Sequence, residues 1–363
     1  MAGIYVHIPF CHAKCAYCDF FSTPKMSQWA DRVVDGIIEE YASRNREISG
    51  LPVETIYFGG GTPSCIPSDL LKRLCESLPM CTASERTIEV NPEDVDHTTA
   101  KFWREIGFNR VSMGVQSLND KELAIINRRH NSSEAITAID TLRAAGFDNI
   151  SCDLIYGLPG QTIRTWTESL DMLLDSGIEH LSAYCLSYEP GTRLSAMLSA
   201  GKIAEAPDEL IADMYQYLCQ KTRQAGFEHY EISNFARPGF HSRHNSSYWH
   251  SVPYLGLGPA AHSCDRDGVR RAAPANISDW LKTGAIIEEE TETDRINDII
   301  ITGLRTAEGL DLDGIPAGAA SETLMSAKTY LKKGWLIKAG TRLIIPENHW
   351  LVSDAVMRDL LLD

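Results

Sequence analysis

The sequence lacks the hydrophobic runs and the leader that mark membrane and exported proteins. Among its 363 residues, no stretch approaches the roughly 18 uncharged apolar residues that a membrane-spanning helix needs. The N-terminus, MAGIYVHIPFCHAKC, has neither a basic leader nor an apolar segment of signal-peptide length. We therefore expect a cytoplasmic protein, for which a peripheral contact with a membrane stays open.

Positive charge is also scarce. Lys and Arg total 34 against 49 Asp and Glu, so the formal net charge is −15, and no run of basic residues offsets it. A surface this negative repels phosphate backbones, and we expect no nucleic acid among the partners. Hydrophobic residues make up 44% of the chain and charged residues 23%, which is typical of a folded globular protein.

Cysteine, in contrast, is abundant, with ten residues. In a cytosolic chain of this size thiols stay reduced, so a disulfide scaffold is a poor explanation. Cys11, Cys15 and Cys18 form a CxxxCxxC array directly after the first expected strand. Three thiolates on one short loop can converge on a metal centre, and Fe–S clusters are held by such loops. The alternatives are a chance grouping of buried cysteines and a zinc site, which would need a fourth ligand.

Strand-like and helix-like segments alternate through the first half of the chain. The expected strands cover residues 3–8, 54–58, 87–90, 110–115, 149–155 and 180–186, with helical apolar spacing between them. Strict alternation implies parallel strands with right-handed crossovers, in an open sheet or a barrel. The pattern changes after residue 191, and we expect three parts: a core at 1–190, a connecting region at 191–290 and a small domain at 291–363. A helix–helix–hairpin order predicts that the last part resembles a winged helix.

Polar residues or glycines stand at the ends of successive expected strands. After the cysteine loop come the glycines 59–61 with Thr62, then Glu89, Gln116 and Asp153. Taken singly, each has an ordinary explanation as a turn, a helix cap or a paired buried carboxylate. Because ligands bind beyond the carboxyl ends of parallel strands, the series as a whole predicts a ligand site at this end of the sheet.

The segment YVHIPFCHAKCAYC at residues 5–18 resembles the radical S-adenosylmethionine (SAM) superfamily. Within it, the lead-in HIPFC is similar to the branch of oxygen-independent coproporphyrinogen III oxidase and the HemW heme chaperones. The resemblance implies an α/β fold, a partial (β/α)6 TIM-like barrel followed by a smaller mixed α/β region and the winged-helix-like domain. It also implies a [4Fe–4S] cluster on Cys11, Cys15 and Cys18, with SAM on the open iron and an external electron donor.

The resemblance further implies which residues surround SAM. The matching positions, which leave open whether one or two SAM molecules bind, are Tyr5, Tyr17, Gly60, Gly61, Thr62, Glu89, Gln116, Arg128 and Asp153. Reduction of the cluster would allow cleavage of SAM to methionine and a 5′-deoxyadenosyl radical. In a chaperone this cleavage could be slow, regulatory or absent, so the resemblance does not decide whether the protein is an enzyme.

Two departures favour the chaperones over the oxidases. The oxidases carry a further cysteine two positions after the third ligand, where this chain has Phe20, and they have a long N-terminal extension before the motif. The element HNxxYW, His244, Asn245, Tyr248 and Trp249, resembles a signature of the chaperone branch.

This element suits a heme, because histidine is the commonest heme ligand and flat rings stack on a macrocycle. A purely structural loop with a buried Trp249 is the alternative. The expected function is heme binding and delivery to client enzymes of the respiratory chain, and the alternative is oxidative decarboxylation of coproporphyrinogen III.

Overall fold

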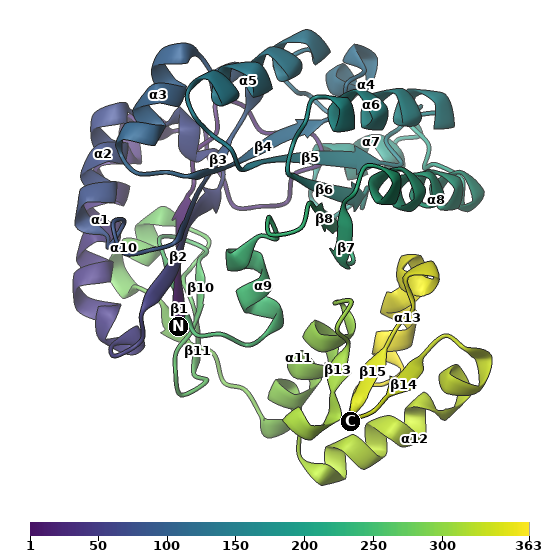
Figure 1. The fold of residues 1–363 in the computed structure, drawn as a ribbon. Coiled ribbons are helices and arrows are strands. Elements are labelled where there is room, and N and C mark those ends of the chain that lie inside the picture. Colours follow the sequence, from purple (N-terminus) through teal and green to yellow (C-terminus); the bar gives the residue numbers. More distant parts are fainter. Residues whose placement is uncertain (363) are drawn as a thin grey trace.

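Six parallel strands form the centre of the protein in a computed structural model that describes residues 1–362 (Figure 1). They lie side by side in sequence order and are β1 (Ala2–Ile8), β2 (Val53–Gly60), β3 (Glu85–Val90), β4 (Arg110–Gln116), β5 (Ile150–Tyr156) and β6 (His180–Cys185). The helices that connect them are α1 (Met26–Arg44), α2 (Ser68–Ser77), α3 (His97–Glu105), α4 (Asp120–Ile125), α5 (Ser132–Ala144) and α6 (Ile163–Asp175). This is the predicted partial (β/α)6 barrel.

The two faces of the sheet differ because side chains alternate along each strand. In β1, Ile4, Val6 and Ile8 are fully buried in the core that the strands share with the outer helices. Tyr5 and His7, between them, lie on the other face and bond to each other. The outer face is therefore apolar and packed, while the concave face carries polar side chains that can meet a ligand.

The sheet extends beyond the six predicted strands at both edges. Next to β6 it adds β8 (Asn234–Ala236) and β7 (Glu228–Glu231), and next to β1 it adds β9 (Tyr254–Leu257), β10 (His262–Cys264), β11 (Arg270–Ala272) and β12 (Ile286–Ile287). The same part of the chain holds α7 (Arg193–Ser199), α8 (Asp208–Gln224), α9 (Arg243–Trp249) and α10 (Ile277–Thr283). The added strands have two to four residues each, too few to show an alternating pattern in the sequence.

The C-terminal part has its own small sheet, in the order β13 (Leu310–Asp311), β15 (Arg342–Ile344), β14 (Ile337–Ala339). Around it pack α11 (Glu292–Leu304), α12 (Ala317–Lys333), the 3₁₀ helix η5 (Glu347–Val352) and α13 (Ser353–Arg358). Two helices followed by a hairpin give the expected winged-helix-like order.

Backbone bonds join this part to the edge of the large sheet, where the Ile232 amide donates to Arg305 O (3.1 Å) and the Ala307 amide to Tyr230 O (3.0 Å). No helix within residues 1–362 has the length and apolarity needed to cross a membrane.

Candidate cofactor site

Cys11, Cys15 and Cys18 lie on the irregular loop between β1 and α1, at the carboxyl end of the first strand. All three side chains are partly exposed. The loop is held from a distance, because the Ala16 amide donates to Ile126 O at 2.9 Å. The predicted ligands therefore stand on one rim of the barrel, on a loop whose backbone is fixed by a segment more than a hundred residues away.

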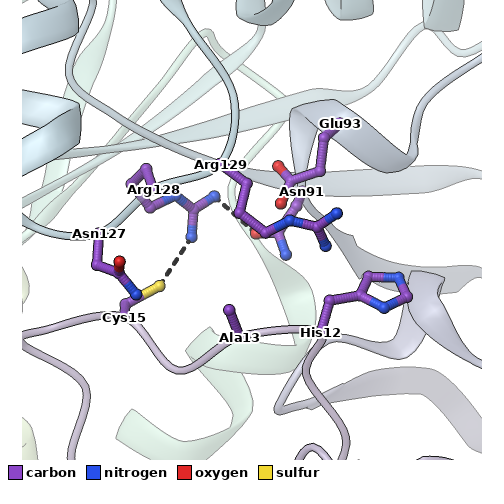
Figure 2. A pocket seen from close by; sticks show the side chains of 8 residues that line it. All are labelled: His12, Ala13, Cys15, Asn91, Glu93, Asn127, Arg128 and Arg129. Atoms are coloured by element: carbon purple, nitrogen blue, oxygen red, sulfur yellow. Dashed lines mark hydrogen bonds between the residues drawn. The ribbon is translucent and has the colours of Figure 1, made fainter.

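A chain of hydrogen bonds connects two of these thiols through the neighbouring strand ends, and Figure 2 shows the part from Cys15 through Arg128 to Asn91. The Arg128 guanidinium donates to Cys15 Sγ (3.3 Å) and to Asn91 Oδ1 (2.6 Å). The Asn91 amide donates to Thr62 Oγ1 (3.2 Å), and the Thr62 hydroxyl donates to Cys11 Sγ (3.3 Å). Donors, one of them positively charged, thus face two sulfur atoms, which is the environment that stabilises thiolates.

Asn91 is a site residue that the sequence analysis missed. It directly follows β3, so it carries the strand-end signal that selected Glu89 two positions earlier. Its side-chain amide accepts from Arg128 through Oδ1 and donates to Thr62 through Nδ2.

The sulfur atoms of the three cysteines would have to move closer together to hold one metal ion. A single ion needs its ligand atoms close together, and Cys11, Cys15 and Cys18 are not among the described groups whose ligand atoms all lie within 4.8 Å of one another. The loop imidazole, His12, faces Asp94 at 3.7 Å. The donor set of three thiols with Arg128 behind it therefore fits an Fe–S cluster better than the zinc alternative.

Without a metal, burial favours the protonated forms of Cys11 and Cys18. Burial, with the charges of Cys15 and Cys11 adding to it, raises the pKa of Cys18 to about 11, and burial also raises the pKa of Cys11. A metal centre binds thiolates, so ligation displaces these protons and becomes easier as the pH rises.

Two carboxylates lie near each other on the concave face. Glu89 accepts from the Tyr57 hydroxyl (2.8 Å) and from the Gly60 amide (3.2 Å). Burial, with the charge of Asp153 adding to it, raises the pKa of Glu89 to about 7. Burial raises the pKa of Asp153 to about 6. These two carboxylates can accept hydrogen bonds from an amino or ribose group, and a cationic partner would stabilise their ionised forms.

The segment that leads into the cysteine loop requires glycine at the end of β2 and directly after it. A Cβ atom at Gly61 would lie 2.5 Å from Phe10 O and 2.9 Å from Ile8 O, and Gly60 has φ +105°. The Gly61 amide donates to Ile8 O at 2.8 Å. The absent side chains thus let the end of β2 pack against the backbone that leads into Cys11.

Gln116 ends β4 in a strained conformation. Its φ of +67° is unusual for a residue other than glycine, and the pairing of β4 with β5 shifts register there. Such strain clusters at functional sites. The side chain is buried, close to the position that a Cβ atom on Gly114 would occupy, and Arg128 borders the same position.

Tyr5 and Tyr17 occupy different surroundings. The Tyr5 hydroxyl lies 3.1 Å from His7 Nδ1, and His7 Nε2 lies 3.1 Å from Phe21 O. Because a carbonyl only accepts, Nε2 carries the proton and Nδ1 accepts from Tyr5. Tyr17 packs on a small apolar cluster that includes Ile126. One tyrosine therefore tethers the end of the cysteine loop through His7, and the other covers it.

The HNxxYW element forms α9, and its histidine is buried in the barrel. His244 Nδ1 lies 2.8 Å from Thr55 Oγ1, and Nε2 lies 2.8 Å from the Tyr248 hydroxyl. Its ring stacks on Tyr57 with 5.1 Å between centroids, and burial lowers its pKa to about 3. The amide of Asn245 donates to Ser242 Oγ (3.3 Å) at the helix start. Ligation of iron by His244 would require one of its two hydrogen bonds to break.

Among the four residues of the HNxxYW element, Trp249 is the one that lines a cavity. It borders a cavity of ≈ 250 Å³ between the sheet edge and the C-terminal part, together with Tyr230, His241 and His250. Its Nε1 atom is buried and has no hydrogen-bond partner among the described residues, while Arg305 lies over the ring at 5.4 Å from its centroid. A buried donor without a partner in a cavity wall marks a place where a ligand acceptor can bind.

Comparisons with known proteins agree on one superfamily and one group of relatives. The family model of the radical SAM superfamily matches residues 5–173. The heme chaperone HemW of Synechocystis sp. is 34% identical over 354 residues, which cover 92% of this chain and 85% of the relative. The heme chaperone HemW of Bacillus subtilis is 37% identical over 267 residues, which cover 72% and 70%.

A solved structure shows the same fold. The radical SAM enzyme coproporphyrinogen III oxidase (HemN) of Escherichia coli superposes with a TM-score of 0.84 over 99% of this chain and 90% of its own, at 23% identity. The predicted barrel and its C-terminal extension are therefore confirmed as a fold.

Proposed function

The chain belongs to the HemW family of the radical SAM superfamily, and from that premise we propose that it is a heme chaperone, which binds heme and passes it to client enzymes of respiration. The observation that carries the proposal is the extent of the similarity, which at 34% identity covers 92% of the chain. The similarity thus reaches well beyond the cysteine loop. We place this exchange in the cytoplasm.

We further propose that Cys11, Cys15 and Cys18 hold a [4Fe–4S] cluster, with SAM beside it on the concave face. The bound pair supplies one-electron chemistry, for which an external electron donor is needed. The protein holds the sulfur atoms in place through Arg128 and Thr62, whose hydrogen bonds reach Cys15 and Cys11.

The carboxylates serve the SAM side in this proposal. Glu89 receives the amino or ribose groups, and the Gly60 amide that bonds to its carboxylate keeps it oriented. Gln116 and Asp153 border the same face from the next strands. The raised pKa values of Glu89 and Asp153 mean that SAM, as a cation, favours their ionised forms and binds more tightly above neutral pH.

For heme, we propose contact through the cavity at Trp249. Ligand pockets are usually about 300–1,000 Å³, and this cavity of ≈ 250 Å³ falls just below that range. A porphyrin would therefore lie across the mouth, with one edge against the indole ring. His244, Asn245 and Tyr248 act here as the support that fixes α9. The exposed His250 next to Trp249 would serve as a ligand through Nε2, which lies 3.5 Å from Glu308, because its Nδ1 bonds to Ser246 O.

The test is a paired assay on one anaerobically reconstituted sample, in which heme is titrated and coproporphyrinogen III turnover is followed. We expect stoichiometric heme binding, about four irons per chain and no loss of coproporphyrinogen III. Conversion of that substrate would overturn the chaperone in favour of the oxidase, and zinc without iron would overturn the cluster. Replacement of Trp249 by Leu should weaken heme binding, whereas Trp29→Leu on α1 serves as the matched control.

A further inference from the structure

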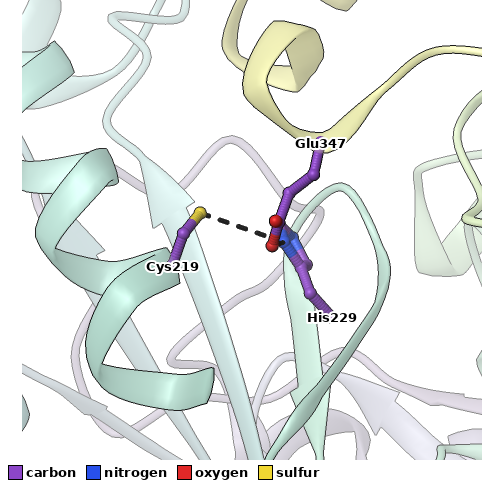
Figure 3. A group of neighbouring side chains, drawn as sticks. All are labelled: Cys219, His229 and Glu347. Carbon is purple, nitrogen blue, oxygen red and sulfur yellow. Dashed lines mark hydrogen bonds and ion pairs between the residues drawn. The ribbon is translucent and has the colours of Figure 1, made fainter. Parts of the chain in front are cut away.

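A second group of metal-ligating side chains lies where the edge of the large sheet meets the C-terminal part (Figure 3). Cys219 comes from α8, His229 from β7 and Glu347 from the first position of η5. One ligand atom from each lies within 4.8 Å of the other two. We propose that this group, distinct from the cysteine loop, is a site for a zinc-type divalent cation that ties the C-terminal part to the sheet.

The distances are close to those of a tetrahedral site. Cys219 Sγ lies 3.9 Å from His229 Nδ1, and Nδ1 lies 2.9 Å from Glu347 Oε1. Zinc bonds of about 2.3 Å to sulfur and about 2.0–2.1 Å to nitrogen or oxygen place tetrahedral ligands about 3.5 Å apart for S and N and about 3.4 Å for N and O. Movements of about half an ångström therefore convert the observed arrangement into a coordination shell.

The hydrogen bonds of His229 favour a cation between its Nδ1 atom, Glu347 Oε1 and Cys219 Sγ. Its Nε2 lies 3.3 Å from Ile232 O, and a carbonyl accepts only, so Nε2 carries a proton. In the neutral ring Nδ1 then has a lone pair, which faces a carboxylate oxygen and a sulfur. The Cys219 thiol can donate its proton to Nδ1, but no proton then lies between Nδ1 and the Glu347 carboxylate unless the ring takes a second proton or a metal binds. A ring N–H that donates to a backbone carbonyl is the usual arrangement behind a metal-bound histidine.

The surroundings hold the ligands in place. The His229 ring stacks on Phe235 with 3.8 Å between centroids and meets Trp350 edge-on at 4.3 Å. Arg223 pairs with the other carboxylate oxygen of Glu347, Oε2, so Oε1 stays free for a metal. Ligating carboxylates commonly have such an outer partner.

The site also has room for a further ligand. Cys219 and Glu347 are partly exposed, while His229 is nearly buried. The buried Tyr215 hydroxyl lies beside Cys219, and, besides burial, each group shifts the pKa of the other. A metal-bound Cys219 thiolate would accept a hydrogen bond from this hydroxyl, and a water can take the fourth position of the metal. The set of thiolate, imidazole and carboxylate suits zinc better than magnesium or calcium, which prefer oxygen ligands alone.

The location gives the site a structural consequence. Glu347 is the only one of the three ligands that belongs to the C-terminal part, so a bound metal would cross-link η5 to α8 and β7. His229 also lines the cavity beside Trp249. Metal binding would therefore fix one wall of that cavity, and the inference stands whether or not heme binds there.

The first experiment measures zinc in the full chain with its cluster reconstituted, after incubation with zinc and removal of the excess. We expect about one zinc per chain in addition to the iron, and an affinity at least about tenfold lower in Cys219→Ser and in His229→Gln. Cys264→Ser is the matched control, because this partly buried cysteine lies on β10 away from the group. Zinc that is absent, or equal in all four proteins, would overturn the proposal.

The second experiment separates this site from the cluster thiols. The full chain with Cys11, Cys15 and Cys18 all replaced by Ala is titrated with Co²⁺, whose thiolate charge-transfer absorption reports ligation by sulfur. We expect this absorption to reach its maximum at one equivalent of Co²⁺ and to disappear when Cys219→Ser is introduced into the same protein. If that variant does not fold, Glu347→Gln replaces it and should weaken Co²⁺ binding. A spectrum without thiolate absorption would mean that His229 and Glu347 form only an ion pair, and the metal site would be refuted.

Discussion

The raised pKa of Glu89 predicts an unusual dependence of stability on pH. This carboxylate lies on the concave face, held by Tyr57 and the Gly60 amide, and burial raises its pKa from 4.5 to about 7. The folded state therefore holds the proton more tightly than the unfolded chain does. Its contribution to stability is fully present below pH 4.5 and is lost as the pH rises through about 7.

The magnitude follows from the difference between the two pKa values. A shift of this size corresponds to about 3 kcal/mol between the extremes. Because Glu89 is partly exposed, we reduce this to about 2 kcal/mol between about pH 5 and about pH 8. Glu89→Gln has no proton to lose, so the variant should lack this component. Asp153 is present in both proteins, so the difference between them reports Glu89 together with its coupling to Asp153.

The assay is urea unfolding of the cluster-free protein without SAM, at both pH values. Wild type should lose about 2 kcal/mol more than Glu89→Gln on going from acid to alkaline pH. Glu39→Gln, on the exposed face of α1, is the matched control and should follow the wild type. If Glu89→Gln also follows the wild type, the carboxylate titrates normally and the argument for its role beside a cation fails.

Three further substitutions test the remaining features. Arg128→Ala removes the charged donor to Cys15 and should lower the iron content after reconstitution severalfold, measured against the unchanged far-UV circular dichroism; full iron would refute the hydrogen-bond chain. Gly61→Ala sets a Cβ atom against Phe10 O and should lower stability by about 2 kcal/mol or more in urea unfolding. His244→Ala leaves buried hydroxyl partners unpaired and should cost about 2–4 kcal/mol. A loss of heme affinity at unchanged stability would instead identify His244 as a direct ligand.

The part of the fold that the sequence predicted is the part with a strong periodic signal. The strand expected at 3–8 is observed as Ala2–Ile8, because Ile4, Val6 and Ile8 alternate with polar neighbours over its whole length. The strands after residue 228 have no such signal. They pair because they lie against the ends of an existing sheet, and that placement is tertiary.

The residues of the candidate sites also fall into those with a signal in the sequence and those that only the tertiary fold brings together. The cysteine array, Glu89 and Gln116 are visible in the sequence because each lies near the carboxyl end of a strand. Asn91 has the same signal and was still missed, since an asparagine before a proline is also an ordinary turn residue. His229 and Glu347 could not be found this way, because they lie 118 positions apart and only the docking of the C-terminal part brings them together.

The cysteine loop depends on the folded barrel rather than the reverse. The Ala16 amide bonds to Ile126 O, the Leu194 amide bonds to Ala16 O, and Arg128 reaches Cys15 across 113 positions of sequence. In a zinc finger the metal supplies the folding energy, and the chain unfolds without it. Here the large apolar core between sheet and helices exists independently of residues 11–18, so the barrel should form first and present the loop to the cluster. Protein stripped of iron should therefore keep its far-UV circular dichroism and a cooperative unfolding transition. An apo-protein without that transition would show that the cluster is part of the core.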